Sequence, residues 1–501
     1  MAFARSTARA DPRVVSSMTR RIRSGWARAF SSRGSAMRFG SVRSGRSLTS
    51  PSLPKTREIH KNRCANKNAQ TYLPNLPRWG KLAVMSSPPL WRNRDFQLLM
   101  VGNTLNGIGS RMSGLAFPLL ALWMTGNAAL AGLVGGAVVA GIVVAGVPAG
   151  AFVDRWNRRA AMVGSALVAA AAYTTVVVAY QAGHLTIAHL VIAGLVVGAA
   201  EAVFEPADTL ATKTVVPAEE LGSAMSAVQG RQGVTGLVGP PLGGALFAIS
   251  RSLPVLADVI SYVMSAAATL LVRTPLPAPP PDGGAHEPPM RAMRSGLRFV
   301  WRHEVLGPVV IVATLLNFAV NGFLLVLIVV LRDRGVRPAG IGLAETAIAV
   351  ATIVGAVLSA VVLKKLPAGR TLIAGAVLLG ICLVACAFVH SYLVVLAVLT
   401  VGFLLVPAGN AGFMTYVMLI TPDAMQGRVQ SALMTSVMGM SPLAPVVGGL
   451  LAQWWGGEAA LVALGGLTLL TALLVLLIGP LRRMPLLADV QPVGAPEAAA
   501  A

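Results

Sequence analysis

The sequence predicts an all-α membrane protein with twelve transmembrane helices in two pseudo-symmetric six-helix bundles. Only 12% of the 501 residues are charged and 55% are apolar, whereas soluble domains carry about 25% charged residues. Apolar runs long enough for the ~30 Å hydrocarbon core of a bilayer follow one another along most of the chain. A repeated motif relates the two halves. These observations exclude a soluble enzyme.

The first 85 residues form a basic leader. They hold 18 Lys and Arg against two acids, and so supply most of the net charge of +22. An organellar transit peptide, a disordered tail attracted to anionic lipid, and a mis-assigned start with translation beginning at Met85 all fit this composition. We favour the start at Met85, because a short basic lead-in to the first apolar run follows it. The rest of the chain is only mildly basic, so we expect no nucleic-acid partner.

The apolar runs divide into six helices in residues 86–272 and six in residues 305–480, before a disordered tail at 481–501. Most connections are short turns rich in Gly, Pro and Asn, such as Thr125-Gly126-Asn127. The predicted helices of the first bundle are 96–122, 128–150, 160–181, 186–211, 220–248 and 253–272. Those of the second bundle are 305–331, 339–362, 371–389, 391–416, 425–452 and 457–479.

Residues 273–304 form a linker between the bundles. Its first part is rich in proline, which lacks an amide hydrogen and stops a helix. Its second part, 290–304, mixes four arginines with apolar residues and predicts an amphipathic helix that lies in the membrane interface. These residues are Arg291, Arg294, Arg298 and Arg302 around Leu297, Phe299, Val300 and Trp301.

The distribution of Lys and Arg predicts the orientation. With a cytoplasmic start, the inner loops after the first span hold fifteen basic residues and the outer loops hold four. Cytoplasmic loops of membrane proteins carry such an excess. We therefore expect a multi-pass protein of the cell membrane with both termini in the cytoplasm.

The two halves share a motif at a fixed offset of 205 residues. Seven identities fall in one ungapped frame, which makes chance agreement among small residues a poor explanation. Two such halves place a substrate site at their interface, near the bilayer midplane. The matched positions are Pro217, Gly222, Ser226, Ala227, Pro240, Gly243 and Gly244 with Pro422, Gly427, Ser431, Ala432, Pro445, Gly448 and Gly449.

The turn between the second and third helices combines one acid with several bases. Residues 150–159 read Gly-Ala-Phe-Val-Asp-Arg-Trp-Asn-Arg-Arg and resemble the loop that joins the same helices in the major facilitator superfamily. The resemblance implies the major facilitator fold and a latch, in which the acid bonds to the amides of helix eleven and holds an outward-open state. An ordinary basic loop with a salt bridge is the alternative. The latch residues are Gly150, Asp154, Arg155, Arg158, Arg159 and, on helix eleven, Arg428.

The fifth helix contains a run of glycine and proline that is similar to the motif of antiporter branches of this superfamily. Small residues allow close helix contact and proline bends a helix, so the motif would seal the protein against leak. A packing kink without functional bias is the alternative. The residues are Gly236, Gly239, Pro240, Gly243 and Gly244.

Two further segments resemble the drug and siderophore efflux branch, which includes macrolide exporter-like and enterobactin exporter-like proteins. They are Gly109–Ser113 in the first helix and Phe204–Ala207 with Val215–Leu221 at the end of the fourth. The resemblance covers about residues 90–480. Helix four lacks the arginine that many proton-coupled exporters carry there, which weakens the inference of proton coupling.

Several ionisable residues lie at depth within the predicted helices, where a charge is costly and marks a functional candidate. Arg231, Glu201 and Glu205 are expected near mid-depth. We expect one of the two glutamates to exchange the coupling proton, with Arg231 as the partner that changes between states. A static Glu–Arg bridge between helices four and five is the alternative.

Other polar groups are weaker candidates. Arg111 faces an anionic substrate or pairs with Asp258, whereas Asp258 and Glu345 are expected to reach toward the outer surface and Asp208 to lie at the interface. Cys382 and Cys386 are interpreted as helix packing. No metal site, cofactor motif or catalytic triad is recognisable. The candidate polar groups of the cavity are Asn103, Asn106, Asn317, Asn321 and Asn410.

These features together predict a secondary transporter that is not an enzyme. We expect it to export a small hydrophobic or amphipathic compound in exchange for protons, by rocking of its two halves, and to act as a monomer in the lipid bilayer. The alternatives are an uptake or uniport carrier of a metabolite and a non-transporting receptor with a transporter fold.

Overall fold

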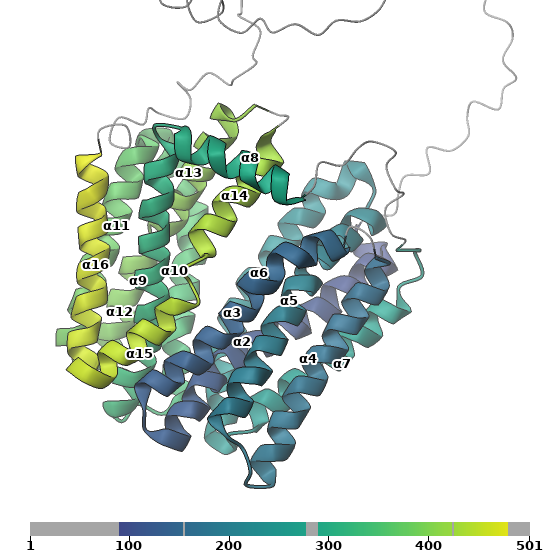
Figure 1. Cartoon of the computed structure of the whole chain (residues 1–501), viewed down its shortest axis with the longest axis horizontal. Coiled ribbons are helices and arrows are strands. Elements are labelled where there is room, and N and C mark those ends of the chain that lie inside the picture. Colours follow the sequence, from purple (N-terminus) through teal and green to yellow (C-terminus); the bar gives the residue numbers. More distant parts are fainter. Residues whose placement is uncertain (1–89, 154–155, 277–288, 423–424, 479–501) are drawn as a thin grey trace, which may run out of the picture. The chain divides into compact units, whose positions relative to one another are not determined.

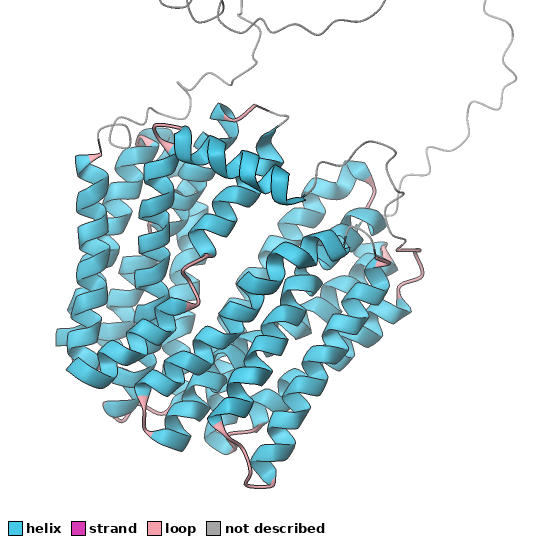
Figure 2. Ribbon diagram, viewed as in Figure 1, coloured by secondary structure: helices cyan, strands magenta, loops and turns pink. Residues whose placement is uncertain are grey.

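The computed structural model describes residues 90–153, 156–276, 289–422 and 425–478. The basic leader, most of the proline-rich part of the linker and the tail at 481–501 lie outside these residues. Apart from turns and short loops, the described residues are helical, and no strand occurs among them (Figure 2). The all-α prediction is therefore confirmed.

The first bundle contains six long helices. Short polar side chains start several of them by accepting hydrogen bonds from free amides of the first turn: Asn93 accepts from Phe96, Asn157 from Arg159 and Ala160, and Thr186 from His189. The helices are α2 (Arg94–Thr125), α3 (Ala128–Val153), α4 (Arg158–Gln181), α5 (Ile187–Val215), α6 (Leu221–Ile249) and α7 (Leu253–Leu271). The short 3₁₀ helices η2 (Leu90–Arg92) and η3 (Ala218–Glu220) precede α2 and α6.

The second bundle follows the linker helix α8 (Pro289–Arg302), which lies across the ends of the long helices (Figure 1). We call the end of the protein that carries α8 the linker end, and the opposite end the far end. The helices of this bundle are α9 (Leu306–Asp333), α10 (Pro338–Lys365), α11 (Ala368–Phe388), α12 (Tyr392–Phe403), α13 (Val406–Ile420), α14 (Gln426–Met438), α15 (Leu443–Trp455) and α16 (Gly457–Leu477).

Two of the twelve predicted helices are interrupted. The predicted helix 391–416 is broken between α12 and α13, and the predicted helix 425–452 between α14 and α15. Proline clashes with the carbonyl four residues before it. Pro407 stands four residues after Phe403, the last residue of α12, and Pro442 four residues after Met438, the last residue of α14. Proline thus accounts for the position of each break.

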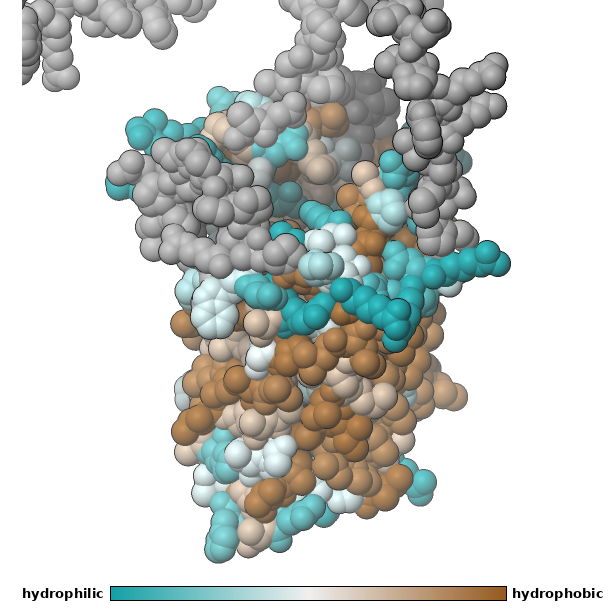
Figure 3. Space-filling view, turned by 90° about the vertical axis from the view of Figure 1, so that its right-hand side faces the viewer, coloured by the Kyte–Doolittle hydropathy of each residue, from teal (hydrophilic) through white to brown (hydrophobic). Residues whose placement is uncertain are grey.

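The helices carry the apolar surface that a bilayer requires. Ten segments of the described chain are long and apolar enough to cross a membrane. α2 and α6 are long enough but less apolar, because both carry charged and amide side chains. These include Asn103, Asn106 and Arg111 in α2 and Arg231 in α6. A broad apolar band lies between hydrophilic regions on the face shown in Figure 3. The protein is therefore a multi-pass membrane protein.

The repeated glycines make equivalent contacts in the two bundles. A Cβ on Gly244 of α6 would lie 2.2 Å from the Pro338 carbonyl oxygen of α10, and a Cβ on Gly449 of α15 would lie 2.3 Å from the Ala128 carbonyl oxygen of α3. Each glycine therefore lets its helix touch the backbone of the opposite bundle. The preceding glycines, Gly243 and Gly448, instead face the first helix of their own bundle, α2 or α9. The sequence repeat is thus a repeat of packing.

These contacts join the bundles at the far end. Gly132 and Gly136 of α3 also lie against the carbonyls of Pro445 and Pro442. Toward the linker end, a Cβ on Gly146 of α3 or Gly230 of α6 would have no neighbour within 4 Å, whereas a Cβ on Gly233 of α6 would still contact Ile353 of α10. Among the described glycines, the close backbone contacts between the bundles lie toward the far end, and α6 and α10 stay in side-chain contact to about the middle of their length.

Candidate functional site

A buried ion pair joins α5 and α6. Arg231 Nη2 lies 2.9 Å from Asp208 Oδ2, and the two side chains are 14% and 6% exposed. A charge is tolerated away from water when it is paired, so each residue of the pair allows the other to be buried. The prediction that Asp208 lies at the interface is wrong. In this structure the partner of Arg231 is Asp208, and not Glu201 or Glu205.

This ion pair belongs to a network that spans four helices. Asp208 Oδ1 accepts a hydrogen bond from the side-chain amide of Asn103 on α2. Asn103 Oδ1 in turn accepts one of 3.0 Å from the Ser265 hydroxyl on α7. Helices α2, α5, α6 and α7 therefore meet at a connected set of polar groups, which fixes their relative positions more tightly than apolar contacts alone.

A second polar group lies closer to the far end. Glu201 is 14 residues from the far-end start of α5, which is about 21 Å at 1.5 Å per residue. The Tyr262 hydroxyl of α7 donates to Glu201 Oε1 at 3.0 Å and lies 3.3 Å from the Ser110 hydroxyl of α2. Glu205, one turn along α5, is exposed. Of the two glutamates, only Glu201 lies within the bundle contacts.

Asp258 of α7 is buried completely. It is 0% exposed, and its Oδ1 accepts a hydrogen bond of 2.9 Å from the Ser261 hydroxyl. Its Oδ2 has no hydrogen-bond partner among the described residues. Gly109 of α2 makes room for this carboxyl, since a Cβ there would lie 2.2 Å from Asp258 Oδ1. The prediction that Asp258 reaches toward the surface is wrong.

Arg111 lies at the boundary between the two bundles. Its charge is close enough to attract Glu201 of its own bundle and Glu345 on α10 of the other. It forms no ion pair closer than 4 Å with any described carboxylate, so it does not pair directly with Asp258. Gly239 of α6 packs on its stem, because a Cβ on this glycine would lie 2.4 Å from Arg111 Cβ. Arg111 is exposed and lies within electrostatic range of one acid from each bundle.

The remaining residues of the glycine and proline motif seal α6 against α10. A Cβ on Gly342 of α10 would lie 2.2 Å from the Pro240 carbonyl oxygen, and Gly236 faces Ala349. The Thr346 hydroxyl donates to the Leu237 carbonyl at 3.3 Å. α6 continues through Pro240 without a break. The motif therefore provides close contact between the bundles.

The predicted latch is only partly within the described chain. Asp154 and Arg155 lie outside it, and Gly150 is described only as part of α3. Arg158 donates to the Thr214 hydroxyl on α5, and Arg159 donates to the carbonyls of Val272 and Thr274 that follow α7. Both arginines thus contact their own bundle. Arg428 lies on α14 of the other bundle.

The asparagine candidates divide between the bundles. Asn106 is buried, and its Oδ1 has no partner among the described residues. Asn317 and Asn321 donate to backbone carbonyls of their own helix, those of Ala313 and Asn317. Asn317 and Asn410 line a mainly apolar cavity of about 150 Å³ between α9, α11 and α13. This cavity lies within the second bundle.

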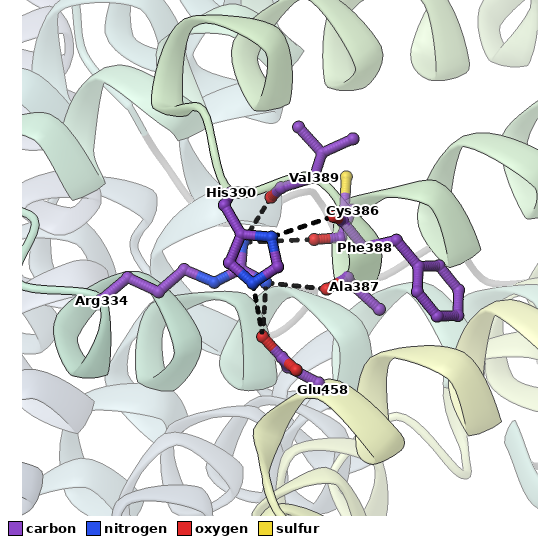
Figure 4. Close-up of polar contacts among 7 residues, drawn as sticks. All are labelled: Arg334, Cys386, Ala387, Phe388, Val389, His390 and Glu458. Carbon is purple, nitrogen blue, oxygen red and sulfur yellow. Dashed lines mark hydrogen bonds and ion pairs between the residues drawn. The ribbon is translucent and has the colours of Figure 1, made fainter.

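A cluster at the far end of the second bundle was not predicted from the sequence (Figure 4). Arg334 donates to the carbonyls of Val389 at 2.6 Å and Ala387 at 2.8 Å, and it forms a 2.9 Å ion pair with Glu458. The carbonyls at the end of a helix lack partners and carry partial negative charge. Arg334 therefore caps α11 and ties it to α16. The basic run after α9 is the one sequence signal that points to this role.

No group of three or more His, Cys, Asp or Glu side chains that could hold a metal ion occurs in the described chain. Cys382 and Cys386 are buried free thiols of α11. The groups described at this site can form hydrogen bonds and ion pairs and can transfer protons.

A known protein family matches both halves of the chain. The family model described as Major Facilitator Superfamily matches residues 99–335 and again residues 310–497. The multidrug efflux pump Tap of Mycolicibacterium fortuitum is 26% identical over 407 residues, which cover 78% of this chain and 97% of that protein. Tap of Mycobacterium tuberculosis (strain ATCC 25618 / H37Rv) is 26% identical over 411 residues, with 79% and 97% covered.

Solved structures share the fold. A bacterial homologue of the iron transporter ferroportin in an inward-facing state superimposes with a TM-score of 0.62 at 16% identity, covering 77% of this chain and 98% of that one. A bacterial homologue of the human lysosomal transporter Spinster, also inward-facing, gives 0.59 at 16%, covering 78% and 96%. At this identity the likeness concerns the fold alone.

Proposed function

Because this chain belongs to the major facilitator superfamily and is a membrane transporter rather than an enzyme, we propose that it exports small hydrophobic or amphipathic compounds against an influx of protons. Both efflux pumps named above match it over almost their whole length, which supports efflux of the drug class. Proton exchange rests on the charged groups of the site.

The position of Arg111 carries this proposal. It stands on α2 against Gly239 of α6, and its charge acts at longer range on Glu201 of the first bundle and Glu345 of the second, so a relative rotation of the bundles would change its distance from each carboxylate. A carboxylate that loses its cation in a low-dielectric site takes up a proton or water. Glu201 is the better proton carrier of the two candidate glutamates on α5, because Tyr262 and Ser110 connect it to α7 and α2. Arg231 holds Asp208 in place.

We place the linker end in the cytoplasm. The described basic side chains gather there, at the linker-end ends of α4, α5, α10 and α11, after α7 and on α8, and only four of the described bases lie at the far end. Closure at the far end then corresponds to an inward-facing state, and the latch around Asp154 would close the linker end in the opposite state. Substrate would enter from the cytoplasm between α3, α6, α10 and α14.

Transport of a fluorescent dye tests the proposal. The full chain is expressed in a bacterial host that lacks its own efflux pumps, and ethidium efflux is followed with and without a protonophore. Glu201→Gln and Glu345→Gln should each lower efflux about tenfold and remove its sensitivity to the protonophore, because each removes a carboxylic acid near Arg111 that could carry the proton. Glu219→Gln, in an exposed turn, should behave as wild type.

Two results would contradict the proposal. Unchanged coupling in the Glu201 and Glu345 variants and in Glu205→Gln would overturn the proton mechanism. Absence of efflux of any compound in a panel of cationic and neutral dyes would overturn export.

A further inference from the structure

The linker helix α8 has a basic face without an ion-pair partner among the described residues. Arg294, Arg298 and Arg302 recur every four residues and are all exposed, so they form one row along the helix. None of them forms an ion pair with a described carboxylate, and α8 itself contains no acid. Three guanidinium groups in a row that form no ion pair with a described carboxylate make a surface that favours an anion.

The opposite face of α8 is fixed to the second bundle. Gly296 lies so close to α14 that a Cβ on it would be 2.4 Å from the Arg428 carbonyl oxygen. Val300 is 0% exposed and packs in a cluster with Val429 and Leu433 of α14. α8 therefore cannot change its height relative to the membrane without moving α14.

The surroundings of the arginines indicate a lipid rather than a soluble anion. Only three residues separate Arg302 from Leu306, where the spanning helix α9 begins, so the row lies at the level where the chain enters the apolar core. Trp301 is 54% exposed beside it, and tryptophan prefers the headgroup level of a bilayer. Arg294, Ser295, Leu297, Arg298, Trp301 and Arg302 line an open hollow of about 730 Å³ on this side.

We propose that α8 binds the phosphate headgroups of anionic phospholipids through Arg294, Arg298 and Arg302, and that Gly296 passes this attachment to α14. Guanidinium groups bind phosphate through paired, charge-assisted hydrogen bonds. Since α14 is the linker-end part of an interrupted span, its attachment to the headgroup layer favours the arrangement in which the linker end is open. The content of anionic lipid then controls how often the linker end closes.

Binding is tested with the purified full chain in nanodiscs of phosphatidylcholine with or without phosphatidylglycerol. Native mass spectrometry counts the retained lipids. Each basic residue near an anionic surface contributes about fivefold to binding, so Arg294→Gln, Arg298→Gln and Arg302→Gln together should weaken phosphatidylglycerol retention about a hundredfold. The matched control removes three bases from another linker-end turn, by Lys364→Gln, Lys365→Gln and Arg370→Gln, and should retain the lipid.

Two results would overturn the proposal. One is equal retention of phosphatidylglycerol by the α8 variant and the control variant, either both high or both lost. The other concerns the stability of the chain. If inorganic phosphate stabilises the chain in phosphatidylcholine nanodiscs as much as phosphatidylglycerol does, the ligand is a soluble anion.

Gly296→Val tests the connection to α14. It should keep lipid retention but remove the effect of phosphatidylglycerol on the linker-end distance between spin labels at Lys213 and Lys365. A persisting effect would refute the connection.

Discussion

The ion pair between Arg231 and Asp208 allows a quantitative prediction. Arg231→Gln leaves the Asp208 carboxylate without its cation in a site where the two side chains are 14% and 6% exposed. Removal of one partner of a buried pair costs about 3–5 kcal/mol of folding free energy, and removal of both costs much less. We therefore expect Arg231→Gln and Asp208→Asn each to lose about 3 kcal/mol, and the double variant to recover at least about 2 kcal/mol of the summed loss.

The assay is denaturant-induced unfolding of the purified chain in mixed micelles, applied to all four members of the cycle. Arg332→Gln is the control, because its pair with Asp333 is 37% and 60% exposed and such pairs contribute about 0–1 kcal/mol. Additive losses in the cycle, or an equal cost for Arg332→Gln and Arg231→Gln, are the two results that would refute the reasoning. Either would mean that the pair does not organise the bundle as described.

Three further predictions concern packing and the far-end cluster. Gly449→Val should open the far end and lower the unfolding free energy by about 1–3 kcal/mol, because even a Cβ there would lie 2.3 Å from the Ala128 carbonyl oxygen. Gly466→Val is the control, because this glycine has free space around it, and it should leave the unfolding free energy unchanged in the same assay. Gly109→Ala should lower the unfolding free energy by about 1–3 kcal/mol, because its Cβ would displace the buried Asp258 carboxyl; a loss no larger than that of Gly466→Val would contradict this. Arg334→Ala should lower unfolding free energy by about 2–4 kcal/mol through the uncapped carbonyls of α11, and a loss below that of Arg332→Ala would count against the capping role.

The fold class and the positions of most helices were predictable from the sequence. Apolar runs and short turns located twelve segments because lipid demands continuous apolar helices. The 205-residue repeat located Gly244 and Gly449, which make equivalent contacts between the bundles. The breaks before α13 and α15 were not predicted. Proline interrupts these two segments, but α6 continues through Pro240 without a break. Proline alone therefore does not decide whether a helix breaks.

The sequence showed that ionisable residues lie deep within α5 and α6, but it did not show that Arg231 pairs with Asp208. Glu201, Glu205 and Asp208 follow one another at helical spacing, so all three lie on neighbouring parts of one face of α5. The predicted helix ended at residue 211, whereas α5 continues to Val215, which places Asp208 deeper than expected and within reach of Arg231. Pairing depends on how helices are rotated against each other, and this rotation is set by contacts distant in sequence.

The resemblance to drug exporters was confirmed at the level of the superfamily and of the multidrug efflux pumps. The likeness to macrolide and enterobactin exporters stays a prediction, as do the latch and proton coupling. Substrate choice depends on small differences in contact energy with apolar walls, which neither the repeat nor the charged residues encode.

Movement of the two bundles is tested most directly by pulsed electron paramagnetic resonance on two pairs of spin labels in nanodiscs. One pair, at Thr125 and Trp454, reports on the far end, and the other, at Lys213 and Lys365, on the linker end; all four side chains are exposed. Alternating access predicts two populations at each end, whose weights change in opposite directions as the pH is lowered. A single unchanging distance at both ends, or changes in the same direction, would contradict the account.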